Sequence, residues 1–295
     1  MKLNGVLPVN KPEGISSFDV IRSLKKKLSL DWNHQKIGHG GTLDMPASGV
    51  LLILFGEATK AFDFLLKSDK IYRANFKFGA FTDTDDAKGN IIESFSATPS
   101  LQEIESALKS FLGVIEQYPP RLSAVHVDGR RAYEIFYSGV TAKLKPKKVV
   151  VKNIKINNYD FKNRLLDLII ECSSGTYIRS LARDLGKKLG CGGYVEHLVR
   201  IMSCGIFIEE CIDLNTMDIG TIKEKLLPLR RVLKLPLLFF NRDKEWILNG
   251  KSLNSQLFFK KNIENGIYQV IHEDSVLAIV EKEGDSFKYL RVFHE

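Results

Sequence analysis

The sequence predicts an α+β protein with a main domain over residues 1–235 and a small β-rich domain over residues 236–295. Strand-like and helix-like segments do not alternate regularly in the main domain, which favours a mixed or antiparallel sheet with flanking helices. The link Glu283-Gly284-Asp285 predicts a tight hairpin near the C-terminus. Short strand-like runs in the β-rich domain lie at 267–271, 276–281 and 287–292.

Composition restricts the class of protein. The 295 residues are 44% hydrophobic and 26% charged, which is ordinary for folded proteins, and the net charge of +8 attracts polyanions. No apolar run reaches membrane-spanning length and no signal-peptide core is present, so we expect a cytoplasmic protein that does not bind a membrane. The four cysteines contain no C-x-x-C pair, which favours reduced structural thiols over zinc or disulfides.

The first elements follow from local patterns. A strand is expected at 5–9 and a helix from Ser16, which stands at capping-box spacing from Asp19. The Gly-rich segment 38–46 precedes a buried strand at 50–55. A helix is expected at 57–66 and an alternating strand at 71–78.

The middle of the chain contains further elements. The acidic cluster Asp83-Thr84-Asp85-Asp86 does not fit a calcium loop, because Lys88 and Ser94 occupy ligand positions, so we expect a solvated turn. A basic connection precedes the later strands. Expected elements are a turn at 82–90, a strand from 91, a helix at 101–111, a strand at 165–172 and a helix at 177–189.

Asp44 is the most informative carboxylate. Glycines on its N-terminal side would let backbone approach a ligand closely, and a rigid buried strand follows. A turn-forming or capping Asp is the plain alternative. The segment lacks the Lys-Ser/Thr ending of a P-loop and does not match G-x-G-x-x-G, which makes nucleotide binding a poor hypothesis.

Arg179 falls in the first turn of the expected helix, where the helix dipole disfavours a cation. Such a cation needs an anion nearby, either a carboxylate such as Asp44 or an RNA phosphate, unless it is a solvated surface residue. Tyr72 and Tyr177 could be core residues or could stack on a base. His39 could face a ligand or solvent, and no partner at ligand spacing suggests a metal.

Five motifs follow one another along the chain: Lys11-Pro12-x-Gly14-x-Ser16-Ser17, Gly38-His39-Gly40-Gly41-Thr42-Leu43-Asp44, Lys70-x-Tyr72, Ser174-Gly175-Thr176-Tyr177-Ile178-Arg179 and Gly192-x-x-Val195-x-x-Leu198-x-Arg200. In this order they resemble the motifs of the TruB family of pseudouridine synthases. The similarity extends along most of the chain, and the C-terminal part resembles, more faintly, the PUA barrel that such enzymes carry.

The resemblance implies an enzyme that converts uridine 55 in the T arm of tRNA to pseudouridine. It implies that Asp44, Tyr72 and Arg179 are catalytic. It implies no metal, ATP or organic cofactor, and a monomer that needs no protein partner. Residues implied to bind the substrate are Lys11, His39, Tyr72, Tyr177 and Leu198.

The chain departs from the family pattern at three places. Asp44 is followed by Met45-Pro46 where Pro is usual directly after the Asp, Leu122 stands where an aromatic residue is common, and His126 where Lys is common. Two alternatives stay open: a guide-RNA-dependent relative acting on ribosomal RNA, and a non-catalytic RNA-binding or RNA-folding protein.

Overall fold

The structure is a computed structural model that describes residues 3–28, 35–123, 125–127, 129–138, 140, 144–260 and 262–294. The α-helices are α1 (Ser17–Lys27), α2 (Phe62–Leu66), α3 (Leu101–Lys109), α4 (Ala132–Tyr137), α5 (Ile178–Lys188), α6 (Ile219–Lys225), α7 (Leu229–Val232) and α8 (Glu245–Leu248). The 3₁₀ helices are η1 (Gly56–Ala61), η2 (Ile208–Glu210) and η3 (Ser255–Leu257).

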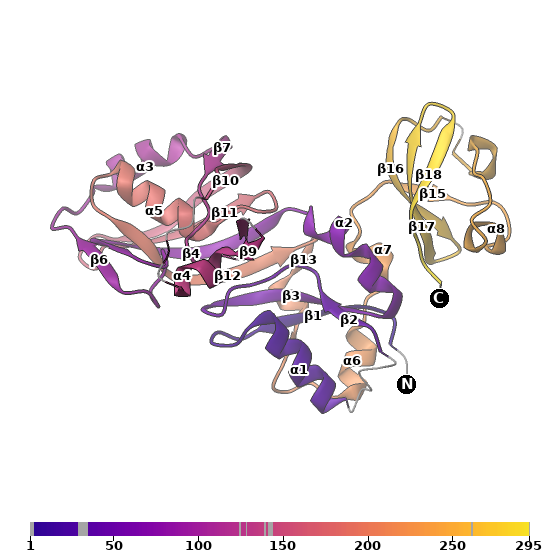
Figure 1. Ribbon diagram of the computed structural model, residues 1–295, viewed down its shortest axis with the longest axis horizontal. Coiled ribbons are helices and arrows are strands. Elements are labelled where there is room, and N and C mark those ends of the chain that lie inside the picture. The colour runs from indigo at the N-terminus through magenta and orange to yellow at the C-terminus, as the bar shows by residue number, and fades with distance from the viewer. Residues whose placement is uncertain are drawn as a thin grey trace. The chain divides into compact units, whose positions relative to one another are not determined.

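The strands form the sheets of the protein (Figure 1). They are β1 (Gly5–Lys11), β2 (Ile37–His39), β3 (Ala47–Phe55), β4 (Lys70–Phe78), β5 (Ala80–Thr82), β6 (Ile91–Ser94), β7 (Gly113–Gln117), β8 (His126–Val127), β9 (Arg130–Arg131), β10 (Lys147–Asp160), β11 (Leu165–Cys172), β12 (Gly193–Ser203), β13 (Ile206–Phe207), β14 (Ile212–Asp213), β15 (Leu237–Phe239), β16 (Gly266–His272), β17 (Ser275–Glu283) and β18 (Ser286–Val292).

The chain forms two compact units. Unit 1 comprises Met1–Met45, Gly49–Ser68 and Ser203–Glu295, and unit 2 comprises Pro46–Ser48 and Asp69–Met202. The expected boundary near residue 235 stays a prediction, although the strands after it form a sheet of their own.

In unit 1, β3 is buried on both faces. It pairs antiparallel with β1 and β2, and β1 pairs parallel with β14. Because side chains alternate along a strand, Leu51, Ile53 and Phe55 pack against α1 and α6, whereas the neighbouring residues face a second cluster. This continuous burial explains the unbroken apolar run of the sequence.

The predicted start of α1 is confirmed. The Ser16 hydroxyl accepts from the Asp19 N–H at 3.1 Å, and the Asp19 carboxylate accepts from the Ser16 N–H at 3.1 Å, which completes the capping box. Val20, Ile21 and Leu24 form the buried stripe. The sequence therefore fixes both the start of this helix and the face that it buries.

In unit 2, β4, β11, β10 and β7 form an antiparallel series, and β12 lies on the other side of β4. The predicted alternation in β4 is confirmed, since Ala74, Phe76 and Phe78 are all buried. They share a core with residues of α3 and α5, and Figure 1 shows these two helices together on one face of the sheet.

The C-terminal segment forms a four-stranded sheet in the order β15-β16-β17-β18, with a core of its own. The predicted hairpin is confirmed, because Glu283 pairs with Ser286 across Gly284-Asp285. Within unit 1, Ile271 and Val276 also pack in the cluster that contains Val50. With this β-rich region and the mixed sheet, the predicted α+β class is confirmed.

Three local expectations need correction. The first half of the helix expected at 57–66 is the 3₁₀ helix η1, and only Phe62–Leu66 is α-helical. The expected basic connection, from Arg121 to Lys148, contains β8, β9 and α4. The turn at 83–86 is not solvated, because Thr84, Asp85 and Asp86 are 8%, 7% and 5% exposed. Among the described residues, no helix combines the length and apolar character needed to cross a membrane.

Replacing the cap of α1 tests how this helix is stabilised. Ser16→Ala removes the side-chain acceptor of the first turn and should lower the free energy of unfolding by about 1 kcal/mol in urea denaturation. Ser23→Ala, inside the same helix, deletes the same atom without removing a cap and should leave stability unchanged or slightly higher. Equal stability of the two variants would contradict the cap assignment.

Candidate active site

The Asp44 loop of unit 1 is held by backbone contacts on both sides of the carboxylate. Asp44 is half-buried between β2 and β3. The Ser17 hydroxyl accepts from the Leu43 N–H at 2.9 Å and donates to the Leu43 carbonyl at 3.0 Å. The Gly14 N–H donates to the Met45 carbonyl at 2.8 Å. The residues before and after Asp44 are therefore fixed, which positions its carboxylate.

A buried lysine reinforces this loop. Lys11 is fully buried, and its ammonium donates to the carbonyls of Pro12 at 2.9 Å, Ile15 at 2.8 Å and Met45 at 3.4 Å. Gly14 adopts a φ of +90°, which permits the turn that brings these carbonyls round the ammonium. The N-terminal motif thus surrounds the segment that carries Asp44.

His39 stands at the end of β2, where it pairs with Ile53 of β3 and is half-buried. The following Gly40 N–H donates to the Leu52 carbonyl at 2.7 Å. These contacts attach the Gly-rich segment to the buried strand. His39 and Asp44, five residues apart in sequence, therefore lie in one segment that is attached to β3.

In unit 2 the start of α5 has an unusual cap. Tyr177 has an extended backbone and makes no side-chain cap hydrogen bond, and the side chain of Gln117 binds the Tyr177 backbone instead. The Gln117 side chain accepts from the Tyr177 N–H at 3.0 Å and donates to the Tyr177 carbonyl at 3.2 Å. Gly175, with φ of +79°, makes the turn before it. Tyr177 is thereby fixed immediately before Arg179.

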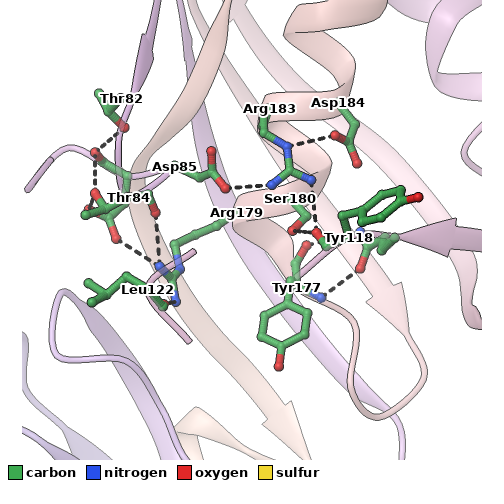
Figure 2. Close-up of polar contacts among 12 residues, drawn as sticks. Thr82, Thr84, Asp85, Tyr118, Leu122, Tyr177, Arg179, Ser180, Arg183 and Asp184 are labelled. Carbon is green, nitrogen blue, oxygen red and sulfur yellow. Dashed lines mark hydrogen bonds and ion pairs between the residues drawn. The ribbon is translucent and has the colours of Figure 1, made fainter. Parts of the chain in front are cut away.

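Arg179 is 5% exposed and does not lie in solvent. Its Nη1 donates to the Thr84 carbonyl at 3.0 Å and lies 3.6 Å from Asp86 Oδ2, while its Nη2 donates to the Leu122 carbonyl at 3.0 Å (Figure 2). A buried cation is costly unless paired, and Asp86 supplies an opposite charge. The guanidinium therefore joins α5 to two loops.

Arg183, one helical turn further along α5, repeats this arrangement. It donates to Asp85 Oδ2 at 2.8 Å and to the Tyr118 carbonyl at 3.0 Å, and that carbonyl also accepts from the Ser180 hydroxyl at 2.8 Å. Asp85 has a φ of 60°, in the left-handed region. Burial raises the pKa of the Asp85 carboxyl above its ordinary value, and this effect exceeds the opposing influence of Arg183 and Arg179.

Tyr72 and Leu198 come from different strands of unit 2. Tyr72 lies in β4 opposite Ile170, Leu198 lies in β12, and both are half-buried. Both pack against the core cluster that contains Ile178, the first residue of α5. The structure thus brings these two side chains to the same core as the helix that carries Arg179.

The sequence analysis missed the acidic partners of α5. Asp85 and Asp86 were expected to lie in a solvated turn, but they pair with Arg183 and Arg179. The available signal was the spacing of the two arginines, since residues four apart share a helix face. Two cations on one face, early in a helix, indicate nearby anions. In the described part of the chain, no group of three or more His, Cys, Asp or Glu side chains is arranged to hold a metal ion.

The three departures from the family pattern have defined positions. Met45 is 55% exposed, although its carbonyl is held inside the loop. Leu122 contributes its carbonyl to Arg179, a contact that does not depend on an aromatic side chain. His126 is exposed in the short strand β8, which pairs with β9.

The family model described as TruB family pseudouridylate synthase (N terminal domain) matches residues 25–178, more than half of the chain. Relatives support this match over nearly the full length. The chain is 35% identical to a tRNA pseudouridine synthase B of Clostridium kluyveri, over 99% of this chain and 100% of the relative. The chain therefore belongs to the TruB family of pseudouridylate synthases.

Other relatives agree. A tRNA pseudouridine synthase B of Borreliella burgdorferi is 36% identical over 98% of this chain and 99% of its own length. Among solved structures, a chain of a Cbf5-Nop10-Gar1 complex matches with a TM-score of 0.74 at 22% identity, covering 98% of this chain and 85% of that one. This structural likeness supports the fold.

The Ser17 contact gives a test of the loop support. Ser17→Ala removes both bonds to Leu43 and leaves a buried N–H without its acceptor, which should cost about 1–3 kcal/mol of stability. The Leu43 amide should exchange its hydrogen faster than in the unaltered protein. Ser23→Ala is the matched control, and unchanged Leu43 exchange in Ser17→Ala would contradict the assigned support.

Proposed function

We propose that this protein isomerises uridine 55 in the T arm of tRNA to pseudouridine. The observation that carries the proposal is near-full-length similarity to relatives named tRNA pseudouridine synthase B. Membership of the pseudouridylate synthase family supports the reaction type. The net charge of +8 suits a polyanionic substrate. The proposed enzyme acts alone, as a cytoplasmic monomer without a cofactor.

The proposed reaction neither gains nor loses atoms. The N1–C1′ bond breaks, the uracil turns, and a C1′–C5 bond forms while a proton leaves C5 and one is taken up at N1. The target base is unreachable while stacked, so it must be flipped out at a cost of roughly a few kcal/mol. Asp44 acts on the ribose, either as nucleophile at C1′ or as base at C2′. The support of its loop by Ser17 and Lys11 favours this role, because catalytic groups need fixed positions.

Arg179 supplies positive charge in the proposed site. Burial disfavours an ionised carboxylate, and a guanidinium close to the reacting groups offsets that effect. The contacts with Thr84, Leu122 and Asp86 support this role, since they give the guanidinium one geometry. Its planar fork holds several acceptors at once, which Lys cannot do in the same way.

The remaining residues bind the nucleoside in this proposal. Tyr72 stacks on the uracil, with its hydroxyl near C5 for proton removal, and Tyr177 and Leu198 line the pocket. The loop of His39 helps to occupy the space that the flipped base leaves. Lys11, which the resemblance implies to bind the substrate, is given an indirect role here: it holds the Asp44 loop through its carbonyl contacts, and its full burial supports this.

Mapping pseudouridine in an unmodified tRNA transcript, before and after adding the purified chain, tests the function. Modification at position 55 without other proteins supports the proposal. Modification only with a guide RNA and partner proteins would favour the alternative of a guide-dependent enzyme. Tight tRNA binding with no modification would favour an RNA-binding or RNA-folding protein.

Asp44→Asn should abolish pseudouridine formation while tRNA affinity stays within about threefold. The change removes the reactive charge but keeps the size of the side chain. Turnover is measured by pseudouridine mapping and affinity by filter binding. Asp285→Asn, in the exposed C-terminal hairpin, removes the same charge away from the site and should turn over normally. Surviving turnover in Asp44→Asn would remove Asp44 from the mechanism.

Arg179→Lys should lower the first-order rate at saturating enzyme by at least about 100-fold, because one ammonium cannot reproduce contacts to two carbonyls and Asp86. Thermal unfolding should show that the variant still folds. Arg242→Lys, at an exposed position in the C-terminal region, is the control and should keep the normal rate. A near-normal rate in Arg179→Lys would refute the geometric role.

A further inference from the structure

Unit 2 contains a cavity of about 400 Å³ along the outer side of α5. Its lining includes Tyr118, Arg121, Arg183 and Lys187, together with apolar side chains from the β5 and β6 region. Neither the sequence motifs nor the proposed roles use this cavity. Its size falls within the range of small-molecule and nucleotide pockets.

The inner wall of the cavity is rigid. The Arg183 guanidinium is held by Asp85 at 2.8 Å, Asp184 at 2.9 Å and the Tyr118 carbonyl at 3.0 Å (Figure 2). A second bond from Ser180 fixes the same Tyr118 carbonyl at 2.8 Å. The backbone that presents the Tyr118 ring is therefore fixed on α5, and a ligand would meet a preformed surface.

Two cations at the cavity are available to an anion. Arg121 and Lys187 are exposed, and neither side chain has an ion-pair or hydrogen-bond partner among the residues that the structure describes. They come from separate segments, one from the loop after β7 and the other from the last turn of α5. Their convergence on one cavity suits a phosphate, which accepts from several donors at once.

The same cavity offers surface for a base. The Tyr118 side chain is 56% exposed and Ile92 is 60% exposed, while Phe81 contributes a further ring. Exposed aromatic rings beside unpaired cations are the arrangement that binds unstacked nucleotides without reading their sequence.

The lining also contains three carboxylates, which equal its three cations in number. Asp85 and Asp184 are both paired with Arg183, and Asp83 accepts from the backbone and side chain of Asn90 at 2.9 Å and 3.2 Å. Four of the six charged side chains of the lining thus make contacts within the protein. The two charged side chains of the lining that make no such contact are Arg121 and Lys187, and these can bind an anionic ligand.

The cavity also lies next to the candidate site. Arg121 directly precedes Leu122, whose carbonyl accepts from Arg179. Arg183 is one helical turn beyond Arg179 on α5. The cavity and Arg179 are therefore neighbours on α5 of unit 2.

We propose that this cavity binds a second nucleotide of the RNA substrate, with its phosphate between Arg121 and Lys187 and its base against Tyr118. The choice of RNA as the ligand rests on the proposed function. Contacts of this kind hold the register of an RNA without specifying its sequence. The cavity would thereby hold the strand while the target uridine is turned at the neighbouring site.

The test compares charge removal inside and beside the cavity. Binding of an unmodified tRNA transcript is measured over a range of salt concentrations for the unaltered protein, the double variant Arg121→Gln/Lys187→Gln, and Lys188→Gln. Lys188 is the next residue of α5, exposed, and outside the cavity lining. The double variant should bind roughly tenfold more weakly at 0.1 M salt. Its slope of log K against log salt should fall in magnitude by about 0.7, because the two cations share one phosphate of the strand.

A second pair of variants tests the base contact. Tyr118→Ala should weaken binding by roughly tenfold through loss of stacking, whereas Tyr118→Phe keeps the ring and should bind normally. The first-order rate at saturating enzyme should stay unchanged in Lys188→Gln, which lies outside the cavity lining. If the double variant matches Lys188→Gln in affinity and salt slope, or Tyr118→Ala matches Tyr118→Phe, the proposal is overturned. Failure of the unaltered protein to form pseudouridine would instead reject the proposed function, because binding is measured independently of turnover.

Discussion

A buried guanidinium is the constraint on which the arrangement of unit 2 depends. Arg179, 5% exposed, must be paired to be tolerated, and its partners come from two loops far apart in sequence. The Arg179 guanidinium can bind both the Thr84–Asp86 loop and Leu122 only when these two segments lie at the start of α5. Arg183 repeats the requirement one turn later with Asp85 and Tyr118. Helix and loops are thus fixed together.

Unit 1 uses the same physical device. Lys11 is fully buried, and its ammonium binds three backbone carbonyls, including that of Met45 beside Asp44. In both units a buried cation holds the backbone of a loop. In unit 1 that loop carries Asp44, whereas in unit 2 the cation, Arg179, is itself the residue proposed to act. The hydrogen bonds that compensate each buried cation are the same ones that hold the loop backbone in place. This explains why polar residues occupy positions that packing alone would give to apolar ones.

Local periodicity predicted much of the fold. The capping box at Ser16 and Asp19 and the alternation around Phe76 depend on neighbours in sequence, and the structure confirms both. The burial of Asp85 and Asp86 depends on Arg179 and Arg183, nearly a hundred residues away, so composition suggested a solvated turn. The 3₁₀ geometry of η1 likewise follows from its surroundings and not from its helical pattern. Asp44 could be singled out from its Gly-rich segment, but its support by Ser17 required the fold.

A double-mutant cycle between Arg179 and Asp86 tests the central claim most directly. The first-order rate of pseudouridine formation in tRNA would be measured at saturating enzyme for Arg179→Lys, Asp86→Asn and the double variant. If the buried pair acts as one unit, the double variant should be about as slow as the slower single variant, giving a coupling of at least about 1 kcal/mol. Rate losses that multiply would show that the two groups act independently and would contradict this account.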